Sequence, residues 1–217
     1  MIISLIGMSR TGKSHQSKIL AQQGYSVFCM DDIIEQKLAS YLIPLGYNGI
    51  ADVSRWMGQP FDNQYVLTSA KYLELEEEAM NEVFGQIEIL QKQLQNSDQT
   101  KIVLDTTGSV IYCSDQVLTL LKHKTTVVYL DTPQSVQDQA YKLYLSDPKP
   151  VYWGNSFYRL DIETNLEALG RCYPLLLKYR SDKYKQIADI TIDYFELRNS
   201  NFSLEFLLQN IDSKKYF

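Results

Sequence analysis

The sequence predicts an α/β fold of three layers, in which helices cover both faces of a five-stranded parallel sheet. Five short, nearly continuous apolar runs lie along the chain, helix-like segments separate them, and a glycine-rich loop joins the first run to the first helix. Such runs are typical of parallel strands that are buried on both faces. Because the 217 residues contain no repeats, low-complexity tracts or linkers, we expect residues 1–217 to form a single domain.

The elements follow from these runs and from helical spacing. Leu73, Met80 and Phe84 recur at helical intervals in the longest helical segment, which we expect to be a long helical insertion. The expected strands are residues 2–6, Ser26–Met30, Lys101–Asp105, Thr125–Asp131 and Asp189–Asp193. The expected helices are Lys13–Gln23, Asp31–Tyr41, Tyr65–Gln95, Pro133–Leu145, Thr164–Ile187 and Ser203–Asn210.

The loop after the first strand, G-M-S-R-T-G-K-S, fits the P-loop pattern G-x-x-x-x-G-K-S in its required context of strand, loop and helix. Glycines let the backbone curl so that its N–H groups point at phosphate oxygens. Lys13 is expected to reach the β- and γ-phosphates, and the Ser14 hydroxyl to ligate Mg²⁺. The chain has no N-K-x-D guanine motif, so the expected nucleotide is ATP. The predicted nucleotide-binding residues are Gly7, Met8, Ser9, Arg10, Thr11, Gly12, Lys13, Ser14 and His15.

Acidic residues follow two of the expected strands. Asp31 and Asp32 come directly after the second strand, where a carboxylate can orient a substrate hydroxyl or take its proton. Helix N-capping explains the same residues without any chemistry, so we assign Asp31 to the substrate and leave Asp32 open. Asp105 ends its strand as a Walker-B Asp does and is a candidate Mg²⁺ ligand, although strand-to-turn transitions also favour Asp.

Polar residues also follow the third and fourth expected strands. Thr107, Gly108 and Ser109 form a polar loop beside the expected substrate. Asp131 precedes Thr132 and Pro133, and we expect it to cap the helix that Pro133 begins.

Two connections are too long to be simple turns. They span Leu42–Asn63 and Ser146–Asp161, and long loops in compact domains are often functional. The second is the better lid candidate (residues 146–161), and its cations, Lys149 and Arg159, are candidates to stabilise charge during transfer. Solvation of a surface loop explains either cation alone. Tyr152 and Trp153 are expected to stack on an acceptor or to pack the closed lid.

The composition excludes several classes of function. A net charge of -5 gives no surface for a polyanion, so we expect no nucleic-acid partner. No apolar run approaches the length of a membrane span, so no membrane partner is expected. The three cysteines are widely spaced and odd in number, which is typical of free thiols in a reducing compartment. We therefore expect a cytoplasmic protein, either a monomer or a weak dimer.

The chain resembles the shikimate kinase family of P-loop small-molecule kinases. The resemblance rests on the P-loop, the second strand with Asp31, the third-strand loop, and the segment from Arg180 through Tyr184 to Ala188-Asp189, which looks like that family's R-x-x-x-Y-x-x-x-A-D helix. It implies a lid, ATP with Mg²⁺, and transfer of the γ-phosphoryl group to a substrate hydroxyl. By resemblance, Asp31 binds that hydroxyl and Arg180 binds a substrate carboxylate, a pairing that suits a guanidinium.

The motifs that would bind the acceptor differ from those of this family. Cys29 stands where the D-x-D motif has its first Asp, and Asp105 or Asp32 are candidates to compensate. Leu73 stands where the F-R-x-x-E motif, here Tyr72 to Glu76, has its Arg. The leading hypothesis is an ATP-dependent kinase of a small, carboxylate-bearing hydroxyl compound, which is shikimate or another acceptor. The alternatives are a non-catalytic ATP-binding regulator and a nucleoside or nucleotide kinase.

Overall fold

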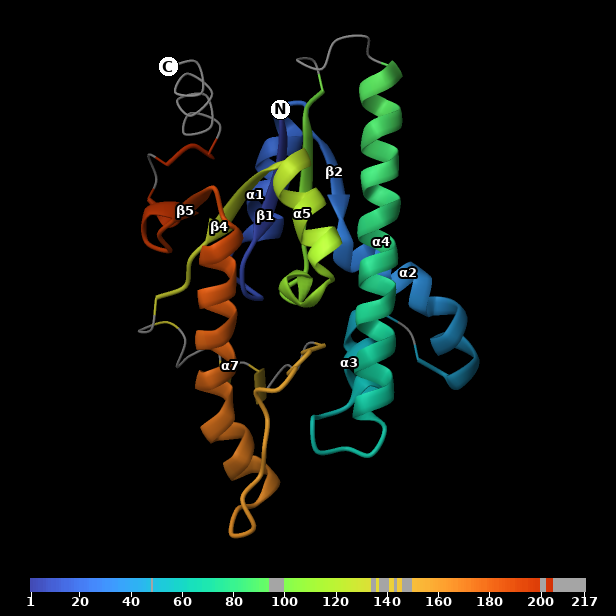
Figure 1. The fold of residues 1–217 in the computed structure, drawn as a ribbon, viewed down its shortest axis with the longest axis vertical. Coiled ribbons are helices and arrows are strands. Elements are labelled where there is room, and N and C mark those ends of the chain that lie inside the picture. Colours follow the sequence, from blue (N-terminus) through green and yellow to red (C-terminus); the bar gives the residue numbers. More distant parts are fainter. Residues whose placement is uncertain are drawn as a thin grey trace.

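A computed structural model describes residues 1–47, 49–93, 100–133, 136, 141–142, 144–145, 150–199 and 202–204, and the fold is given for these. Five strands form one sheet in the order β2-β3-β1-β4-β5 (Figure 1). Every pairing is parallel, and Ser4 in the central strand lies between Leu104 and Val127. The strands are β1 (Ile2–Ile6), β2 (Ser26–Cys29), β3 (Ile102–Asp105), β4 (Thr126–Leu130) and β5 (Ile190–Ile192).

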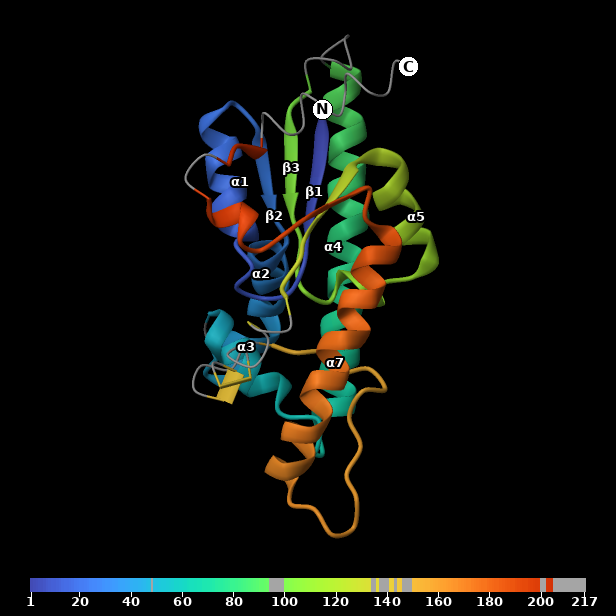
Figure 2. The same cartoon turned by 90° about the vertical axis from the view of Figure 1, so that its left-hand side faces the viewer.

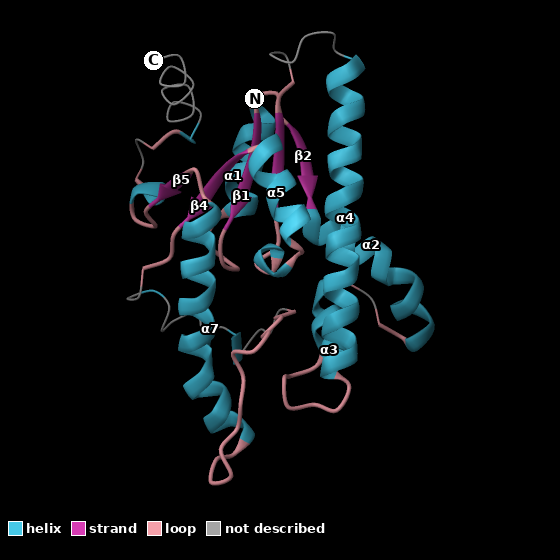
Figure 3. Ribbon diagram, in the orientation of Figure 1, coloured by secondary structure: helices cyan, strands magenta, loops and turns pink. Residues whose placement is uncertain are grey.

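Helices cover both faces of this sheet. Figure 2 shows α1 on one face and α4, α5 and α7 on the other, which is the three-layer architecture expected from the sequence. The helices are α1 (Lys13–Gln22), α2 (Met30–Leu42), α3 (Ile50–Met57), α4 (Tyr65–Gln93), α5 (Asp115–Lys124) and α7 (Asn165–Ile187). Short 3₁₀ turns lie at η1 (Ile43–Leu45), η3 (Val110–Tyr112) and η4 (Glu196–Arg198). In Figure 3 the strand arrows point toward α3 and the middle of α7, so the carboxyl ends of the strands face that half of the molecule.

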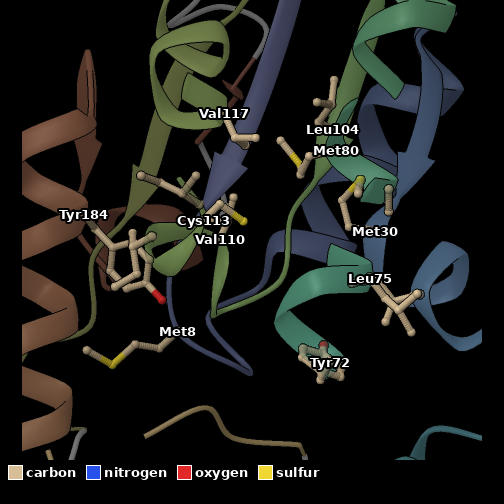
Figure 4. Packing of buried hydrophobic residues seen from close by; sticks show 14 of the residues in the cluster. Met8, Met30, Tyr72, Leu75, Met80, Leu104, Val110, Cys113, Val117 and Tyr184 are labelled. Atoms are coloured by element: carbon tan, nitrogen blue, oxygen red, sulfur yellow. The ribbon is translucent and has the colours of Figure 1, made fainter. Parts of the chain in front are cut away.

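Alternate side chains of the strands build two cores. Ile3 and Leu5 of β1 pack with Leu20 of α1 on one face. Ile2 and Ile6 belong to the larger cluster on the other face, to which α2, α4, α5 and α7 contribute. Figure 4 shows part of this larger cluster, with Tyr184 of α7 reaching toward Val110. Burial of both faces explains why the strands read as continuous apolar runs.

The expected strands are all present, and each ends within one residue of its predicted bounds. The helices predicted from residues 13, 31, 65 and 164 are also present. The helices expected at Pro133–Leu145 and Ser203–Asn210 fall mainly outside the described residues. Helix α5 was not predicted. It begins after Ser114, whose hydroxyl accepts a hydrogen bond from the Val117 N–H (3.4 Å) as an N-cap.

The expectation of a long loop at Leu42–Asn63 was wrong. This segment contains η1 and α3, and α3 packs against α2 and α4. Val53 and Met57 of α3 are fully buried, so the helix is held by its apolar side. Gly49 and Gly58 flank α3 with φ values of 82° and 79°, and such glycines conceal a helix of two turns in a loop-like sequence.

The candidate lid is packed where the structure describes it. Trp153 is 1% exposed, its backbone N–H donates to the Tyr65 hydroxyl (2.7 Å), and that hydroxyl donates to the Val151 carbonyl (3.0 Å). The Trp153 ring also makes edge contacts with Tyr144, Phe157 and Tyr173. Of the two roles expected for Trp153, packing is therefore the one that this arrangement supports. No helix in the described part of the chain is long and apolar enough to cross a membrane.

Candidate active site

The loop between β1 and α1 has the tight curl that a phosphate cradle needs. Gly7 has φ +145°, and a Cβ built there would lie 2.8 Å from the Leu130 carbonyl oxygen. Gly12 has φ +108° at the N-cap of α1. The Thr11 hydroxyl donates to the Met8 carbonyl (3.0 Å), which closes the loop on itself. Both glycines are thus required by the backbone path, and the helix N-terminus behind them favours an anion.

Lys13 lies at the centre of this loop. Its ammonium donates to the carbonyl oxygens of Gly7 (3.0 Å) and Met8 (2.9 Å). Burial lowers the pKa of Lys13, while the carboxylates of Asp105 and Asp31 oppose that shift and Arg180 adds to it. The P-loop lysine, both predicted acidic positions and the predicted acceptor arginine therefore share one electrostatic neighbourhood. The other predicted P-loop positions divide into buried Met8 and Thr11 and exposed Ser9, Arg10, Ser14 and His15.

The sheet register brings the acidic residues together. Cys29 at the end of β2 lies beside Asp105 at the end of β3. Asp105 is buried and accepts a hydrogen bond from the Ser17 hydroxyl of α1 (3.4 Å). Asp31 and Asp32 occupy the first turn of α2, and the N-cap residue is Cys29. N-capping therefore does not explain either aspartate, although both carboxylates suit the positive end of the helix.

Cys29 carries no charge at the position where the D-x-D motif has its first Asp. Burial, with the nearby carboxylates of Asp32 and Asp105, raises the pKa of the thiol to about 12. No cluster of three or more His, Cys, Asp or Glu side chains suited to a metal occurs among the described residues. Nucleotide-bound Mg²⁺ needs only one or two carboxylates beside phosphates and waters. Asp105, Ser14 and Asp32 stay the predicted ligands of a magnesium ion that a nucleotide helps to hold.

Arg180 is buried against the loop after β3. One of its amino groups, Nη2, donates to the Tyr152 carbonyl (2.8 Å), and its guanidinium lies 5.5 Å from the Tyr112 ring centroid. A Cβ at Gly108 would lie 3.1 Å from the other amino group, Nη1. Its buried Nε has no hydrogen-bond partner within the described chain, and Arg180 forms no ion pair with a described carboxylate. Such a buried cation is open to an anionic group of a ligand.

The rest of the α7 motif fixes this arginine in place. The Tyr184 hydroxyl donates to the Gly108 carbonyl (2.5 Å), one helical turn after Arg180. The Asp189 carboxylate accepts a hydrogen bond from the Val127 N–H of β4 (2.8 Å). Both contacts tie α7 to the carboxyl edge and the body of the sheet. The tyrosine and aspartate of the motif thus have positioning roles.

The predicted capping role of Asp131 depends on residues outside the described part of the chain and stays a prediction. Its carboxylate accepts a hydrogen bond from the Tyr129 hydroxyl (2.6 Å) and lies 3.4 Å from the Lys185 ammonium. The carboxylate is thus engaged with β4 and α7, and the helix that it was expected to cap lies mainly outside the described residues.

Sequence reasoning did not include Glu76 among the site residues. Glu76 of α4 is 1% exposed and accepts hydrogen bonds from the hydroxyls of Thr107 and Ser109 (2.6 Å for Ser109). Burial raises its pKa to about 7. The available signal was its place at the end of the Tyr72–Glu76 motif, but helical spacing alone marks it only as one of many glutamates in α4.

Several tyrosines lie near Arg180. Six phenol groups lie close enough to its guanidinium for its charge to act on them. This grouping gives a structural place to part of a chain unusually rich in tyrosine, and nothing in their spacing along the sequence predicts it. They are Tyr65, Tyr72, Tyr112, Tyr144, Tyr173 and Tyr184.

The two candidate lid cations are not both described. Lys149 lies outside the described residues. Arg159 is exposed and donates to the Glu163 carbonyl (3.3 Å). Its predicted action on a phosphoryl group stays a prediction.

Comparisons with known proteins agree with this architecture. No family model and no curated protein matches the chain. A shikimate kinase from Acinetobacter baumannii, solved in complex with shikimate, is 22% identical with a TM-score of 0.59, over 99% of this chain and 94% of that one. A shikimate kinase from Bacteroides thetaiotaomicron is 16% identical with a TM-score of 0.57, over 100% and 99%. One from Aquifex aeolicus is 16% identical with a TM-score of 0.54, over 100% and 96%. The chain is therefore similar to shikimate kinases throughout its length, and its fold is the P-loop kinase fold that they share.

Proposed function

We propose that this protein is an ATP-dependent phosphotransferase that moves the γ-phosphoryl group of ATP to a hydroxyl of a small metabolite carrying a carboxylate. The observation that carries the proposal is that Lys13, held in the P-loop at the carboxyl edge of the sheet, lies within electrostatic reach of Asp31, Asp105 and Arg180. Ligands of open α/β sheets bind at this edge. Three solved structures that are similar to this chain over nearly all of its length are shikimate kinases.

Each of these residues has a distinct proposed role. Lys13 and the P-loop amides hold the phosphates. Ser14 and Asp105, with Asp32, would hold Mg²⁺, which would supply positive charge to neutralise the phosphates. Arg180 pairs with the acceptor carboxylate through its free Nε and the neighbouring amino group. The acceptor oxygen bonds to the γ-phosphorus as the bond to ADP breaks, and Asp31 takes the hydroxyl proton.

The test is the formation of ADP by the purified protein with ATP and Mg²⁺, first with shikimate and then with a panel of small hydroxyl acids. We expect turnover that depends on an acceptor. Lys13→Ala is expected to abolish it while the melting temperature stays within a few degrees of that of the wild type. Retained turnover in Lys13→Ala would contradict the P-loop assignment.

A second candidate, a regulator that binds ATP without turnover, is favoured by one observation. The neutral thiol of Cys29 replaces a carboxylate beside Asp105, which weakens the set of magnesium ligands. ATP binding without turnover on any acceptor in the panel would support this candidate. Shikimate turnover would instead mean that Leu73 and the loop Thr107–Ser109 are compatible with that acceptor.

A further inference from the structure

The loop that faces Arg180 is held from the opposite side by one buried carboxylate. The two oxygens of Glu76 accept separate hydrogen bonds, Oε1 from the Thr107 hydroxyl and Oε2 from the Ser109 hydroxyl. Thr107 Oγ1 also accepts from the Ser109 N–H (3.1 Å) and lies 3.1 Å from Ser109 Oγ. These contacts close a ring of three side chains around the residue between them, Gly108.

Gly108 is the point where this ring meets the acceptor side of the site. Its carbonyl accepts the Tyr184 hydroxyl (2.5 Å), and its Cα faces the Arg180 guanidinium so closely that a Cβ would lie 3.1 Å from Nη1. A displacement of the loop therefore moves the surface against which Arg180 packs. The loop Thr107–Ser109 thus connects Glu76 of α4 with Arg180 and Tyr184 of α7.

The partners of the Glu76 carboxylate are hydroxyl groups. It forms no ion pair with a described Lys or Arg, and Leu73, one turn before it on α4, is apolar. A buried carboxylate without a cation is costly unless hydrogen bonds satisfy it. The hydroxyls of Thr107 and Ser109 supply those bonds, so this loop and this carboxylate depend on each other.

We propose that Glu76 is a positioning residue of the acceptor site, which fixes the loop Thr107–Ser109 and thereby the surface against which Arg180 binds the acceptor. This inference rests on the proposed phosphotransferase function. Glu76 does not touch the reacting atoms and acts only through the loop.

The ring also links the site to pH. When Glu76 is protonated, its new O–H can donate to one hydroxyl while that hydroxyl donates to the other, so the contacts survive and only the charge changes. Burial raises the pKa of Glu76 to about 7 from 4.5. The titratable and charged groups that act on it or feel its charge are Asp31, Tyr72, Cys113, Arg180 and Tyr184.

The sign of the effect on stability follows from this raised pKa. Between about pH 4.5 and 7 the folded protein keeps a proton that the unfolded chain releases. The contribution of Glu76 to the free energy of unfolding is therefore fully present below pH 4.5 and is lost as the pH rises through 7. Ionised Glu76 also repels an anionic acceptor near Arg180, so acceptor affinity is expected to fall over the same range.

The test compares Glu76→Ala and Glu76→Gln with the same changes at Glu77. Glu77 is a matched control because it also binds a serine, accepting hydrogen bonds from the N–H (3.1 Å) and hydroxyl (2.5 Å) of Ser114 outside the site. Glu76→Ala is expected to raise the acceptor KM about tenfold or more, with a smaller effect on kcat and an unchanged KM for ATP. Glu76→Gln restores the hydrogen bonds and is expected to recover most of the affinity while removing its pH dependence near 7.

Two readouts do not depend on turnover. Hydrogen exchange of the Ser109 N–H is expected to be faster in Glu76→Ala and unchanged in Glu77→Ala. The fall in the free energy of unfolding between pH 5 and 8 is expected to be smaller in Glu76→Gln than in Glu77→Gln. If Glu76→Ala does not fold, the comparison of unfolding free energies between Glu76→Gln and Glu77→Gln is the test of the inference.

Equal acceptor KM values, or equal exchange and equal pH slopes, in the Glu76 and Glu77 variants would overturn the inference. Absence of turnover in the wild-type protein with every acceptor would contradict the proposed function instead, and the exchange and unfolding comparisons would still test Glu76.

Discussion

Replacing Arg180 by methionine separates an acceptor-binding role from a structural one. Methionine is long enough to fill much of the same space among the surrounding tyrosines, but it has no charge and no donors. Arg180 is 7% exposed, so its charge is almost fully desolvated, and no described carboxylate pairs with it. If Arg180 serves stability, this change lowers the free energy of unfolding. If Arg180 serves acceptor binding, the change lowers the acceptor affinity instead.

The magnitudes follow from the contacts. Loss of the bond from Nη2 to the Tyr152 carbonyl costs about 1–3 kcal/mol, while removal of a buried, unpaired charge recovers a comparable amount. The net free energy of unfolding is thus expected to change by less than about 1 kcal/mol. Two charge-assisted hydrogen bonds to an acceptor carboxylate are worth at least about 3 kcal/mol together, which corresponds to a loss of about 100-fold in affinity.

The assay pairs two measurements on the same samples. Acceptor affinity and ATP affinity are measured by titration calorimetry, and the free energy of unfolding by urea denaturation. We expect Arg180→Met to bind the acceptor about 100-fold more weakly, with the ATP affinity and the unfolding free energy nearly unchanged. A loss of several kcal/mol in stability with an unchanged acceptor affinity would refute this reasoning and assign Arg180 to packing.

Other changes test the remaining parts of the site. Asp31→Asn is expected to lower kcat with little change in ATP affinity, and an unchanged rate would return Asp31 to a role at the start of α2. Cys29→Asp adds a carboxylate beside Asp105 and is expected to lower the Mg²⁺ concentration for half-maximal turnover; no change would mean that no magnesium ligand is missing there. Gly7→Ala is expected to destabilise the protein by about 2–5 kcal/mol, because a positive φ adds to a 2.8 Å approach to a carbonyl oxygen. Gly24→Ala, also at positive φ (+88°) but with open space around its Cβ, is expected to cost only about 1–2 kcal/mol in urea denaturation.

The nucleotide half of the site was readable from the sequence because its signals are local. A P-loop is one contiguous loop, and both of its glycines are required by the backbone path at Gly7 and Gly12. The strands were readable because most of their side chains are apolar, and the central strands β1 and β3 are buried along their whole length. Asp105 and Asp31 could be placed together because the carboxyl ends of parallel strands meet at one edge.

The acceptor half was less readable because it is assembled from distant segments. Glu76 meets Thr107 and Ser109 across about thirty residues of chain, and Arg180 meets Tyr152 through a segment that looked like a mobile lid. The role of Trp153 depends on rings from other parts of the chain, which no spacing rule brings together. The two-turn helix α3 was hidden for a different reason, since glycines at both ends make a short helix resemble a loop.

The most direct test of the phosphotransferase proposal is to follow the phosphoryl group itself by phosphorus NMR. The protein is incubated with ATP, Mg²⁺ and the acceptor that stimulates ADP formation, and Asp31→Asn is run in parallel. We predict a new phosphomonoester signal that grows in step with ADP in the wild-type protein and far more slowly in the variant. ADP accompanied only by inorganic phosphate, or no ADP with any acceptor, would contradict the proposal that this protein transfers the γ-phosphoryl group to a hydroxyl.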